Sequence, residues 1–232
     1  MRPEELTTIH RLPLFSGTDE ETYNSLMRAA YLQTFPAHVQ LITEGDAADF
    51  LYVVVEGLVE LFAVSNDRET TLTIASPPTT FILAAVLKDA VYLASARTIQ
   101  KSRLLLIPAA NVRAALDDDV EFSRSMVQEL AGNYRSLMKA LKGQKLRSAT
   151  ERLANYLLQQ KESQGGHSRI ILPHGKRTLA SLLGMTPENL SRAFSALKQY
   201  GIDVNSREVS IGKLADLENF ARPSPFIDDD KV

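Results

Sequence analysis

The chain has 232 residues, of which 44% are hydrophobic and 23% are charged, and it contains no cysteine. This length accommodates two domains, and the composition is that of an ordinary globular protein. The lack of cysteine excludes disulfides, thiolate zinc sites and a cysteine-ligated iron–sulfur cluster. No apolar run is long enough to cross a membrane and no signal segment opens the chain, so we expect a cytoplasmic protein without membrane contact.

The net charge of −2 conceals an uneven distribution along the chain. Residues 145–213 hold eleven Lys and Arg against five Asp and Glu, whereas residues 1–144 hold thirteen against eighteen. The last residues, 214–232, are acidic again, with two basic side chains against five acidic ones. A basic segment beside acidic ones indicates contact with a polyanion through that segment, although a solvated basic face has the same composition.

Short strands are predicted from Phe35 to about Ile107. Residues 50–56 predict one strand and residues 58–64 the next, with Gly57 as the turn between them. Alternation places two sets of side chains each on one face of its strand: Leu51, Val53 and Val55, and then Val59, Leu61 and Ala63. Many short strands at this spacing favour a small rolled or closed sheet.

A long helix is predicted from Asp119, which can cap its first turn, to about Lys142. Five apolar side chains recur in it at alternating spacings of three and four: Val127, Leu130, Tyr134, Leu137 and Leu141. This pattern over two heptads favours a seam that pairs two copies of the chain. An ordinary core-facing helix has the same pattern, and two heptads do not separate these interpretations.

Two short helices joined by a tight turn are predicted from Arg177 to Leu197. Gly184 ends the first helix, because glycine takes the left-handed conformation at little cost. Thr186 is a good N-cap for the second helix, and Pro187 suits its first position. We expect a short strand at residues 170–172, a later one at 208–211, and a disordered acidic tail from Pro223 to Val232.

The second helix has two faces of different chemistry. Its apolar side chains, which we expect to point inward, are Leu190, Ala193, Phe194 and Leu197. The opposite face carries an acceptor, hydroxyls and a forked cation, which are groups that read base edges in the major groove. We therefore predict that Glu188, Ser191 and Arg192 read DNA bases, and that the flanking phosphate contacts are Lys176, Arg177, Thr178, Ser195 and Lys198. The alternative is a helix pair packed for stability whose polar side chains are merely exposed.

The chain from Leu6 to about Leu214 resembles the Crp/Fnr superfamily of transcription regulators. The resemblance covers the order of the elements, the turns at Gly45-Asp46 and Gly57, the long helix and the helix pair. Glu188-Asn-Leu-Ser-Arg192 is similar to the Glu-x-x-Ser-Arg pattern of the fumarate–nitrate reductase regulator branch. It departs from the Arg-Glu-x-x-x-Arg of the cyclic-AMP branch, because Thr186-Pro187 stand where the first Arg would be.

This resemblance implies an α+β fold with four segments. These are a cyclic-nucleotide-binding-like β-roll sensor (1–116), a dimerisation helix (117–144), a winged helix-turn-helix (145–214) and an acidic tail (215–232). It also implies a homodimer on double-stranded DNA, at an inverted repeat similar to TTGAT-N4-ATCAA, with RNA polymerase as a further partner. We expect no enzyme activity and no bound metal, since the chain has no nucleophile–base pattern, metal-spaced cluster or phosphate-cradling glycine loop.

Cyclic-nucleotide binders of this family use a cassette resembling Gly-Glu-Leu followed by Arg-Ser-Ala. Here Ala84 stands at the Glu position and Ala94 at the Arg position, so only Ser95 and the alanine after it remain. Arg97 is close in sequence, but we expect it on the other face of its strand. Cyclic AMP is therefore disfavoured, although a displaced Lys88 could attract an anion.

The dissimilatory nitrate respiration regulators are also similar, and they imply an apolar cassette and nitric oxide sensing through haem. Plain core packing explains the apolar residues 81–93 equally well. Of the four histidines, His10 is the best candidate for a haem ligand, while His167 and His174 are expected at the surface. Two further hypotheses stay open: a cyclic-nucleotide-responsive regulator, and a cyclic-nucleotide-binding signalling module that does not bind DNA.

Overall fold

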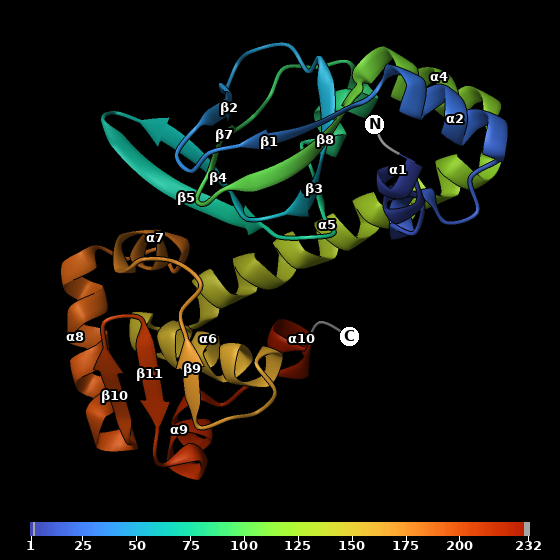
Figure 1. Cartoon of the computed structure of the whole chain (residues 1–232). Coiled ribbons are helices and arrows are strands. Elements are labelled where there is room, and N and C mark those ends of the chain that lie inside the picture. Colours follow the sequence, from blue (N-terminus) through green and yellow to red (C-terminus); the bar gives the residue numbers. More distant parts are fainter. Residues whose placement is uncertain (2, 230–232) are drawn as a thin grey trace. The chain divides into compact units, whose positions relative to one another are not determined.

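The computed structural model describes Met1 and residues 3–229, which form two compact units, Met1–Tyr134 and Arg135–Val232. The long helix α5 (Val120–Leu146) begins in the first unit and ends in the second. Helices and strands are mixed in the predicted order, with a strand-rich first unit and a helix pair in the second (Figure 1). The predicted fold class is therefore confirmed.

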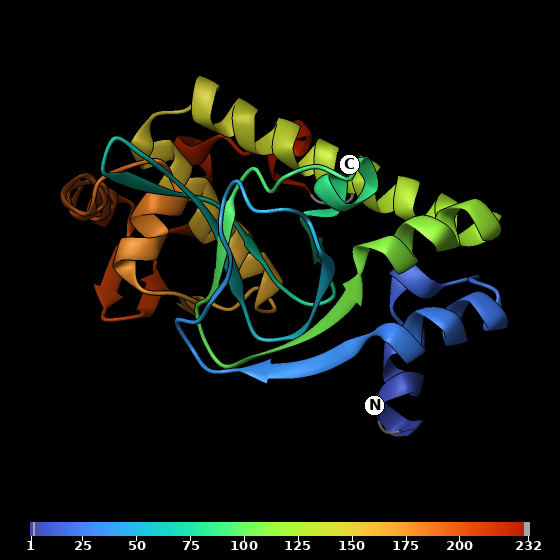
Figure 2. The same ribbon diagram turned by 90° about the horizontal axis from the view of Figure 1, so that it is seen from above.

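The first unit is a β-roll with helices beside it (Figure 1). Its strands are β1 (Tyr31–Phe35), β2 (Gln40–Ile42), β3 (Phe50–Glu56), β4 (Val59–Ser65), β5 (Arg68–Ala75), β6 (Thr80–Phe81), β7 (Ser95–Thr98) and β8 (Ser102–Pro108). They form two antiparallel sheets, in the orders β1-β8-β3-β6 and β2-β7-β4-β5. Seen from above, these strands curve around a common core (Figure 2).

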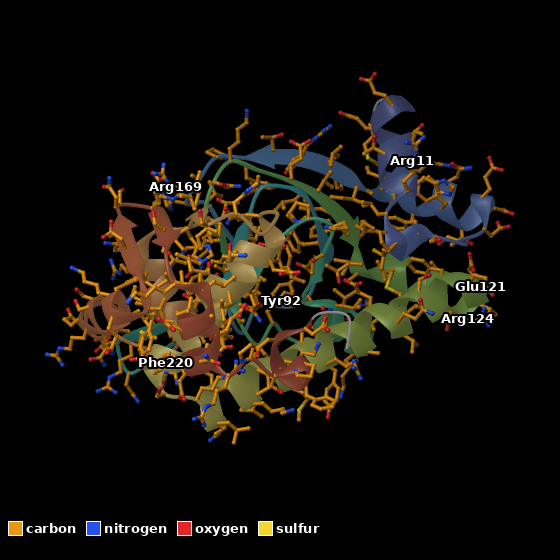
Figure 3. The ribbon with its side chains drawn as sticks, turned by 90° about the horizontal axis from the view of Figure 1, so that it is seen from below. Arg11, Tyr92, Glu121, Arg124, Arg169 and Phe220 are labelled. Carbon is orange, nitrogen blue, oxygen red and sulfur yellow. The ribbon has the colours of Figure 1, made fainter. Side chains whose placement is uncertain are left out.

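The helices of this unit are α1 (Pro3–His10), η1 (Pro13–Phe15), α2 (Glu20–Ala29), α3 (Leu83–Lys88) and α4 (Ala109–Asp118). Asp119 caps α5 as predicted, because its carboxylate accepts a hydrogen bond from the backbone N–H of Phe122 at 3.0 Å. Glu121 and Arg124 form an exposed ion pair near the beginning of α5 (Figure 3).

The predicted strands are present as β3 and β4, and burial on them extends to both faces. Leu51, Tyr52, Val53 and Val54 are all buried, because α3 and α4 pack against β3 in addition to the core of the roll. On β4 the carboxylate of Glu60 is buried as well, since it accepts hydrogen bonds from Arg97 and Thr71. Strands covered on both faces carry apolar side chains on both of them, as β3 does.

The second unit combines helices with a small antiparallel sheet. Its helices are α6 (Ala149–Ser163), α7 (Lys176–Leu182), α8 (Pro187–Leu197), η2 (Lys198–Tyr200), α9 (Leu214–Ala221) and α10 (Pro225–Asp228). Its strands are β9 (Arg169–Ile171), β10 (Ile202–Asn205) and β11 (Glu208–Ile211), in the order β10-β11-β9. The β10–β11 hairpin follows the helix pair, which is the arrangement of a winged helix-turn-helix.

The disorder predicted from Pro223 onward is wrong for residues 223–229, which include α10, and the acidic residues before them, from 215, belong to the packed helix α9. Leu217 and Ala221 of α9 are buried, and Phe220 (labelled in Figure 3) stacks on Tyr200 with ring centroids 4.6 Å apart. Beyond α9, Asp228 of α10 forms an ion pair with Arg147. The acidic composition of the segment hid these contacts, because the partners are far away in the sequence. Residues 230–232 of the predicted tail lie outside the described residues.

Candidate nucleic-acid interface

The tight turn between α7 and α8 depends on glycine. Gly184 has a φ of +63°, the left-handed conformation that glycine adopts without strain. A Cβ at this position would lie 2.7 Å from Oε1 of Gln144, near the end of α5. The turn is therefore closed by its backbone conformation and by the close approach of α5, and the predicted end of the first helix is confirmed.

The start of α8 has the predicted cap. The hydroxyl of Thr186 accepts a hydrogen bond from the backbone N–H of Asn189 at 3.2 Å, and Pro187 is the first helical residue. The backbone N–H of Glu188 and then the Thr186 hydroxyl hold the pKa of the Glu188 carboxyl below its ordinary value. Glu188 is therefore ionised at neutral pH, which suits an acceptor for the amino group of cytosine.

The two faces of α8 separate as the sequence predicts. The buried side chains are Leu190, Ala193, Phe194 and Leu197, and the exposed ones are Glu188, Ser191, Arg192 and Ser195. The hydroxyl of Ser195 donates to the carbonyl of Ser191 at 3.0 Å, one turn back on the same helix. The exposed face thus brings a carboxylate, a hydroxyl and a guanidinium together over the first turn and a half of α8.

The residues predicted to contact phosphates lie on α7, on α8 and at the end of α8. Lys176 and Arg177 occupy the first turn of α7, where they are exposed, and Thr178 beside them is half-buried. Lys198 is exposed at the end of α8. These cations are thus exposed on or beside the two helices of the predicted site, and contacts of such side chains with phosphates fix the register on a duplex.

One structural residue of the site was missed from the sequence. Arg152 of α6 donates from Nε to the carbonyl of Leu183 at 2.8 Å and from Nη2 to that of Gly184 at 3.3 Å. It thereby holds the turn that precedes α8. No local pattern indicates this role, because an Arg within an amphipathic helix is ordinarily a solvated side chain.

Comparison with known proteins assigns both units. Residues 32–119 match the cyclic nucleotide-binding domain family, and residues 151–220 match the Crp-like helix-turn-helix domain family. The second match contains the whole of α7 and α8 with the exposed face described above. The chain is a Crp/Fnr-type transcription regulator.

Named relatives share this architecture over most of their length. The CRP-like cAMP-activated global transcriptional regulator of Mycobacterium tuberculosis is 25% identical over 218 residues, which are 91% of this chain and 96% of that protein. FixK2 from Bradyrhizobium japonicum shares the fold with a TM-score of 0.73 and 22% identity, covering 84% of this chain and 98% of that one. A CooA variant from Carboxydothermus hydrogenoformans gives a TM-score of 0.71 and 21% identity, covering 84% and 89%.

In the regulator's sensor unit, the four predicted effector residues differ in exposure. Ala84 and Lys88 are exposed on α3, whereas Ala94 and Ser95 are buried at the start of β7. The hydroxyl of Ser95 accepts a hydrogen bond from the backbone N–H of Glu44 at 3.0 Å. Tyr92 (labelled in Figure 3) lies buried in the same segment and donates its hydroxyl to the carbonyl of Phe50.

Arg97 pairs with two carboxylates on the face of the sheet opposite Ala96. Its Nε donates to Glu60 at 2.8 Å, and its terminal nitrogens donate to Glu69 at 2.7 and 3.1 Å. Its guanidinium also lies 4.3 Å from the ring centroid of Phe62. The hydrogen bonds that Arg97 donates to Glu69 are the main cause that raises the pKa of Arg97 above its ordinary value.

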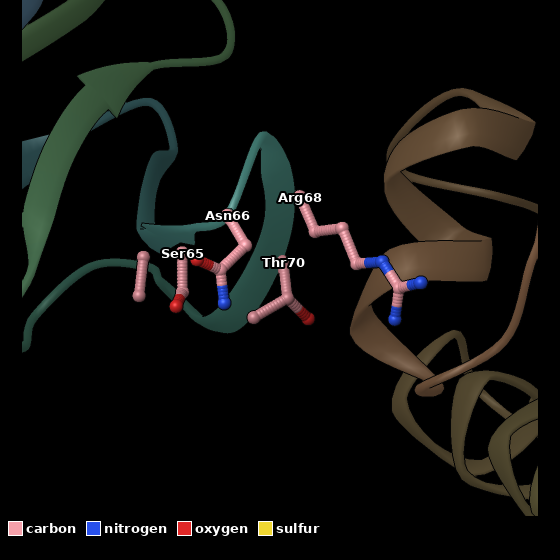
Figure 4. A pocket seen from close by; sticks show the side chains of 5 residues that line it. Ser65, Asn66, Arg68 and Thr70 are labelled. Carbon is pink, nitrogen blue, oxygen red and sulfur yellow. The ribbon is translucent and has the colours of Figure 1, made fainter.

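A separate hollow in the sensor unit lies at the β4–β5 hairpin. It is lined by Ala63, Ser65, Asn66, Arg68 and Thr70, the last four of which are labelled in Figure 4. None of the predicted effector residues belongs to this lining.

The histidines differ from their predicted environments at one position. His10 is exposed at the end of α1, with its ring centroid 4.4 Å from that of Tyr23. His174, predicted at the surface, is buried instead, and its Nε2 lies 3.0 Å from the hydroxyl of Tyr156 on α6. A haem bound to His10 would lie on the outside of the unit, in water, so the surroundings of His10 do not fit a haem site.

The apolar stripe of α5 is exposed along its whole length. Val127, Leu130, Tyr134, Leu137 and Leu141 retain between 38% and 66% of their accessible surface. This result removes the alternative of an ordinary core-facing helix, because the buried residues of α5 are Phe122 and Met126 instead.

In the described part of the chain, no helix has the length and apolar character needed to cross a bilayer.

Proposed function

We propose that this regulator binds an inverted repeat similar to TTGAT-N4-ATCAA and reads it with Glu188, Ser191 and Arg192. The observation that carries the proposal is the exposed face of α8, where these three side chains stand opposite a fully buried apolar face. In helix-turn-helix proteins the beginning of the second helix enters the major groove. The pattern of these residues favours an operator of the fumarate–nitrate reductase regulator branch.

Each proposed base contact has a chemical counterpart. Arg192 can donate two parallel hydrogen bonds to O6 and N7 of guanine, and ionised Glu188 can accept from N4 of cytosine. The exposed cations Lys176, Arg177 and Lys198 contact phosphates, together with Thr178 and Ser195. The net positive charge of residues 145–213 supports this arrangement.

We further propose that two chains pair along the exposed stripe of α5. Five large apolar side chains on one helix face favour burial against a second copy, because that copy presents the same stripe. A twofold dimer also matches an inverted repeat, in which each recognition helix meets one half-site.

The effector that we propose is not cyclic AMP. An anionic phosphate inside the roll needs a compensating cation, and the buried Ala94 at the matching position supplies none. Arg97 does not replace it, since Glu60 and Glu69 already compensate its charge. The mycobacterial relative is described as cAMP-activated, so the two proteins differ in this respect under our proposal.

Haem with nitric oxide stays a hypothesis for the effector, and the exposed position of His10 speaks against that residue as its ligand. An absorption spectrum of the purified protein with added haem tests this hypothesis. A Soret band that is present in the wild type and absent from a His10→Ala variant would restore His10 as the ligand.

RNA polymerase is the partner that we propose for the DNA-bound dimer, in the cytoplasm, because the relatives act as transcriptional regulators.

The decisive experiment is a fluorescence-anisotropy titration with the palindrome, a series of single-base variants of it, and random DNA. Arg192→Ala should weaken binding to the palindrome about 10–100-fold, the worth of one bidentate base contact, and change binding to random DNA little. Glu188→Ala should relax the preference at one symmetric base pair. Neither side chain packs inward, so both variants should keep their fold.

Arg11→Ala is the matched control, because it removes the same charge from an exposed position of the sensor unit. Equal losses at every operator position and on random DNA would show that α8 does not read bases. A wild-type protein without any DNA binding would instead favour the signalling module.

A further inference from the structure

The segment that follows α9 is fastened to α5 and α6 by side-chain contacts. The carboxylate of Asp228 in α10 accepts two parallel hydrogen bonds from the guanidinium of Arg147, one of them at 2.6 Å. The side chains of this pair are only 10% and 12% exposed. Two-pronged pairing of this kind fixes geometry as well as charge.

Further contacts hold the backbone of the same segment. Lys139 and Lys142 of α5 donate to the carbonyls of Asp229 at 2.6 Å and Phe226 at 3.2 Å. Gln159 of α6 donates to the carbonyl of Asp228 at 3.3 Å. A helix of four residues has no stability of its own, so these contacts account for its order.

Arg147 occupies the junction between two helices. It follows Leu146, the last residue of α5, and precedes Ser148, the N-cap of α6. Its own carbonyl accepts a hydrogen bond from Nη1 of Arg152 at 2.8 Å. The same guanidinium of Arg152 donates hydrogen bonds to the carbonyls of Leu183 and Gly184, which lie in the turn before Thr186, the N-cap of α8. A continuous set of contacts thus leads from Asp228 to the start of the recognition helix.

We propose that residues 223–229 are a positioning strap, which holds the α5–α6 junction so that α8 is presented in one orientation. The inference rests on the proposed DNA-binding function. The strap lies outside residues 151–220, which match the helix-turn-helix family. Two half-sites at a set spacing require recognition helices at a set spacing, and a loose junction removes that constraint.

The test measures the DNA affinity of the full-length Asp228→Ala variant and of the wild type by titration. The DNA molecules are palindromes whose half-sites are separated by three, four or five base pairs. Wild type should prefer one spacer, and the variant should bind that operator about tenfold more weakly, a factor typical of coupled sites. It should also discriminate less between spacers. The loss of a negative charge would by itself strengthen binding to DNA. The strap predicts the opposite change in affinity, which is weaker binding.

Glu218→Ala is the matched control, because it removes an exposed carboxylate from α9. Asp228→Asn is the second variant, which keeps the shape of the side chain and serves if Asp228→Ala does not fold. In an Arg147→Ala background, the effect of Asp228→Ala should disappear, since the strap acts through that pair.

Stoichiometric titration counts the active fraction in every sample. A variant with fewer active molecules but unchanged spacer preference has a structural defect only, and this result would overturn the strap. Unchanged affinity of both Asp228 variants would overturn it as well while leaving the proposed function intact. A wild type that binds none of the palindromes would defeat the proposed function first.

Discussion

At the scale of single residues, Asp119 shows how one side chain fastens several elements. Its carboxylate accepts the backbone N–H of Phe122 in the first turn of α5 and, at 2.8 Å, that of Asp19, the N-cap of α2. The hydrogen bond from Phe122 is the main reason why the pKa of this carboxyl lies below its ordinary value of 3.8. Asp119 thus joins two helix starts that are a hundred residues apart.

We expect Asp119→Ala to lower the free energy of unfolding by about 1–2 kcal/mol at pH 7, because a buried cap and a second amide partner are lost. The folded state holds the ionised form, so this stabilisation is complete above pH 3.8 and disappears as the pH falls through the lower folded pKa. Urea denaturation over a pH series measures the difference between wild type and variant. The exposed neighbour Asp118 provides the control Asp118→Ala. If the difference in free energy of unfolding between wild type and Asp119→Ala stayed constant down to the lowest pH, ionised Asp119 would not be the source of the stabilisation.

At the scale of elements, α5 serves the two units with different faces. Phe122 and Met126 bury its first turns in the sensor unit, and Glu129 accepts hydrogen bonds from the backbone N–H and the hydroxyl of Thr80. Its last turn approaches Gly184 in the second unit. The stripe from Val127 to Leu141 stays exposed in this chain, which is why we propose a second chain as its occupant.

Leu130→Lys combined with Leu137→Lys should convert the proposed dimer into monomers, because two charges would have to be buried against apolar partners. Sedimentation velocity gives the mass of the particle directly. Gln128→Lys with Ser136→Lys adds the same charge at exposed positions on the other side of α5 and should leave the dimer intact. A double-lysine seam variant that still sediments as a dimer would move the interface elsewhere.

At the scale of the whole molecule, a sensor unit and a DNA-binding unit are joined by one continuous helix. An effector bound in the roll can influence α8 only by favouring one of two arrangements that differ in DNA affinity. The roll matches the cyclic nucleotide-binding domain family, so under our proposal the identity of an effector depends on the chemistry of the cassette.

With Ala94 at the phosphate-anchoring position, cyclic AMP should bind more weakly than about 1 mM, a binding free energy near −4 kcal/mol. Isothermal titration calorimetry measures it, with the cAMP-activated mycobacterial relative as the positive control. Micromolar binding would show that another cation takes the place of the missing Arg and would restore the cyclic-nucleotide-responsive regulator.

The sequence by itself determined the helix-turn-helix and its outer face. Gly184, Thr186 and Pro187 act within a few residues of their own positions, so their signals can be recognised without knowing the rest of the chain. The spacing of apolar side chains on α8 is equally local, and it separates the buried face from Glu188, Ser191 and Arg192. The long helix with its cap at Asp119 follows from the same kind of pattern.

Tertiary structure decided what depends on partners distant in sequence. The burial of His174, the double pairing of Arg97 and the burial of both faces of β3 each need another element for their explanation. The strap is the clearest case, because Arg147 and Asp228 are separated by 81 positions. An acidic stretch is attracted to a cation wherever the fold brings one within reach, and composition contains no information about that distance.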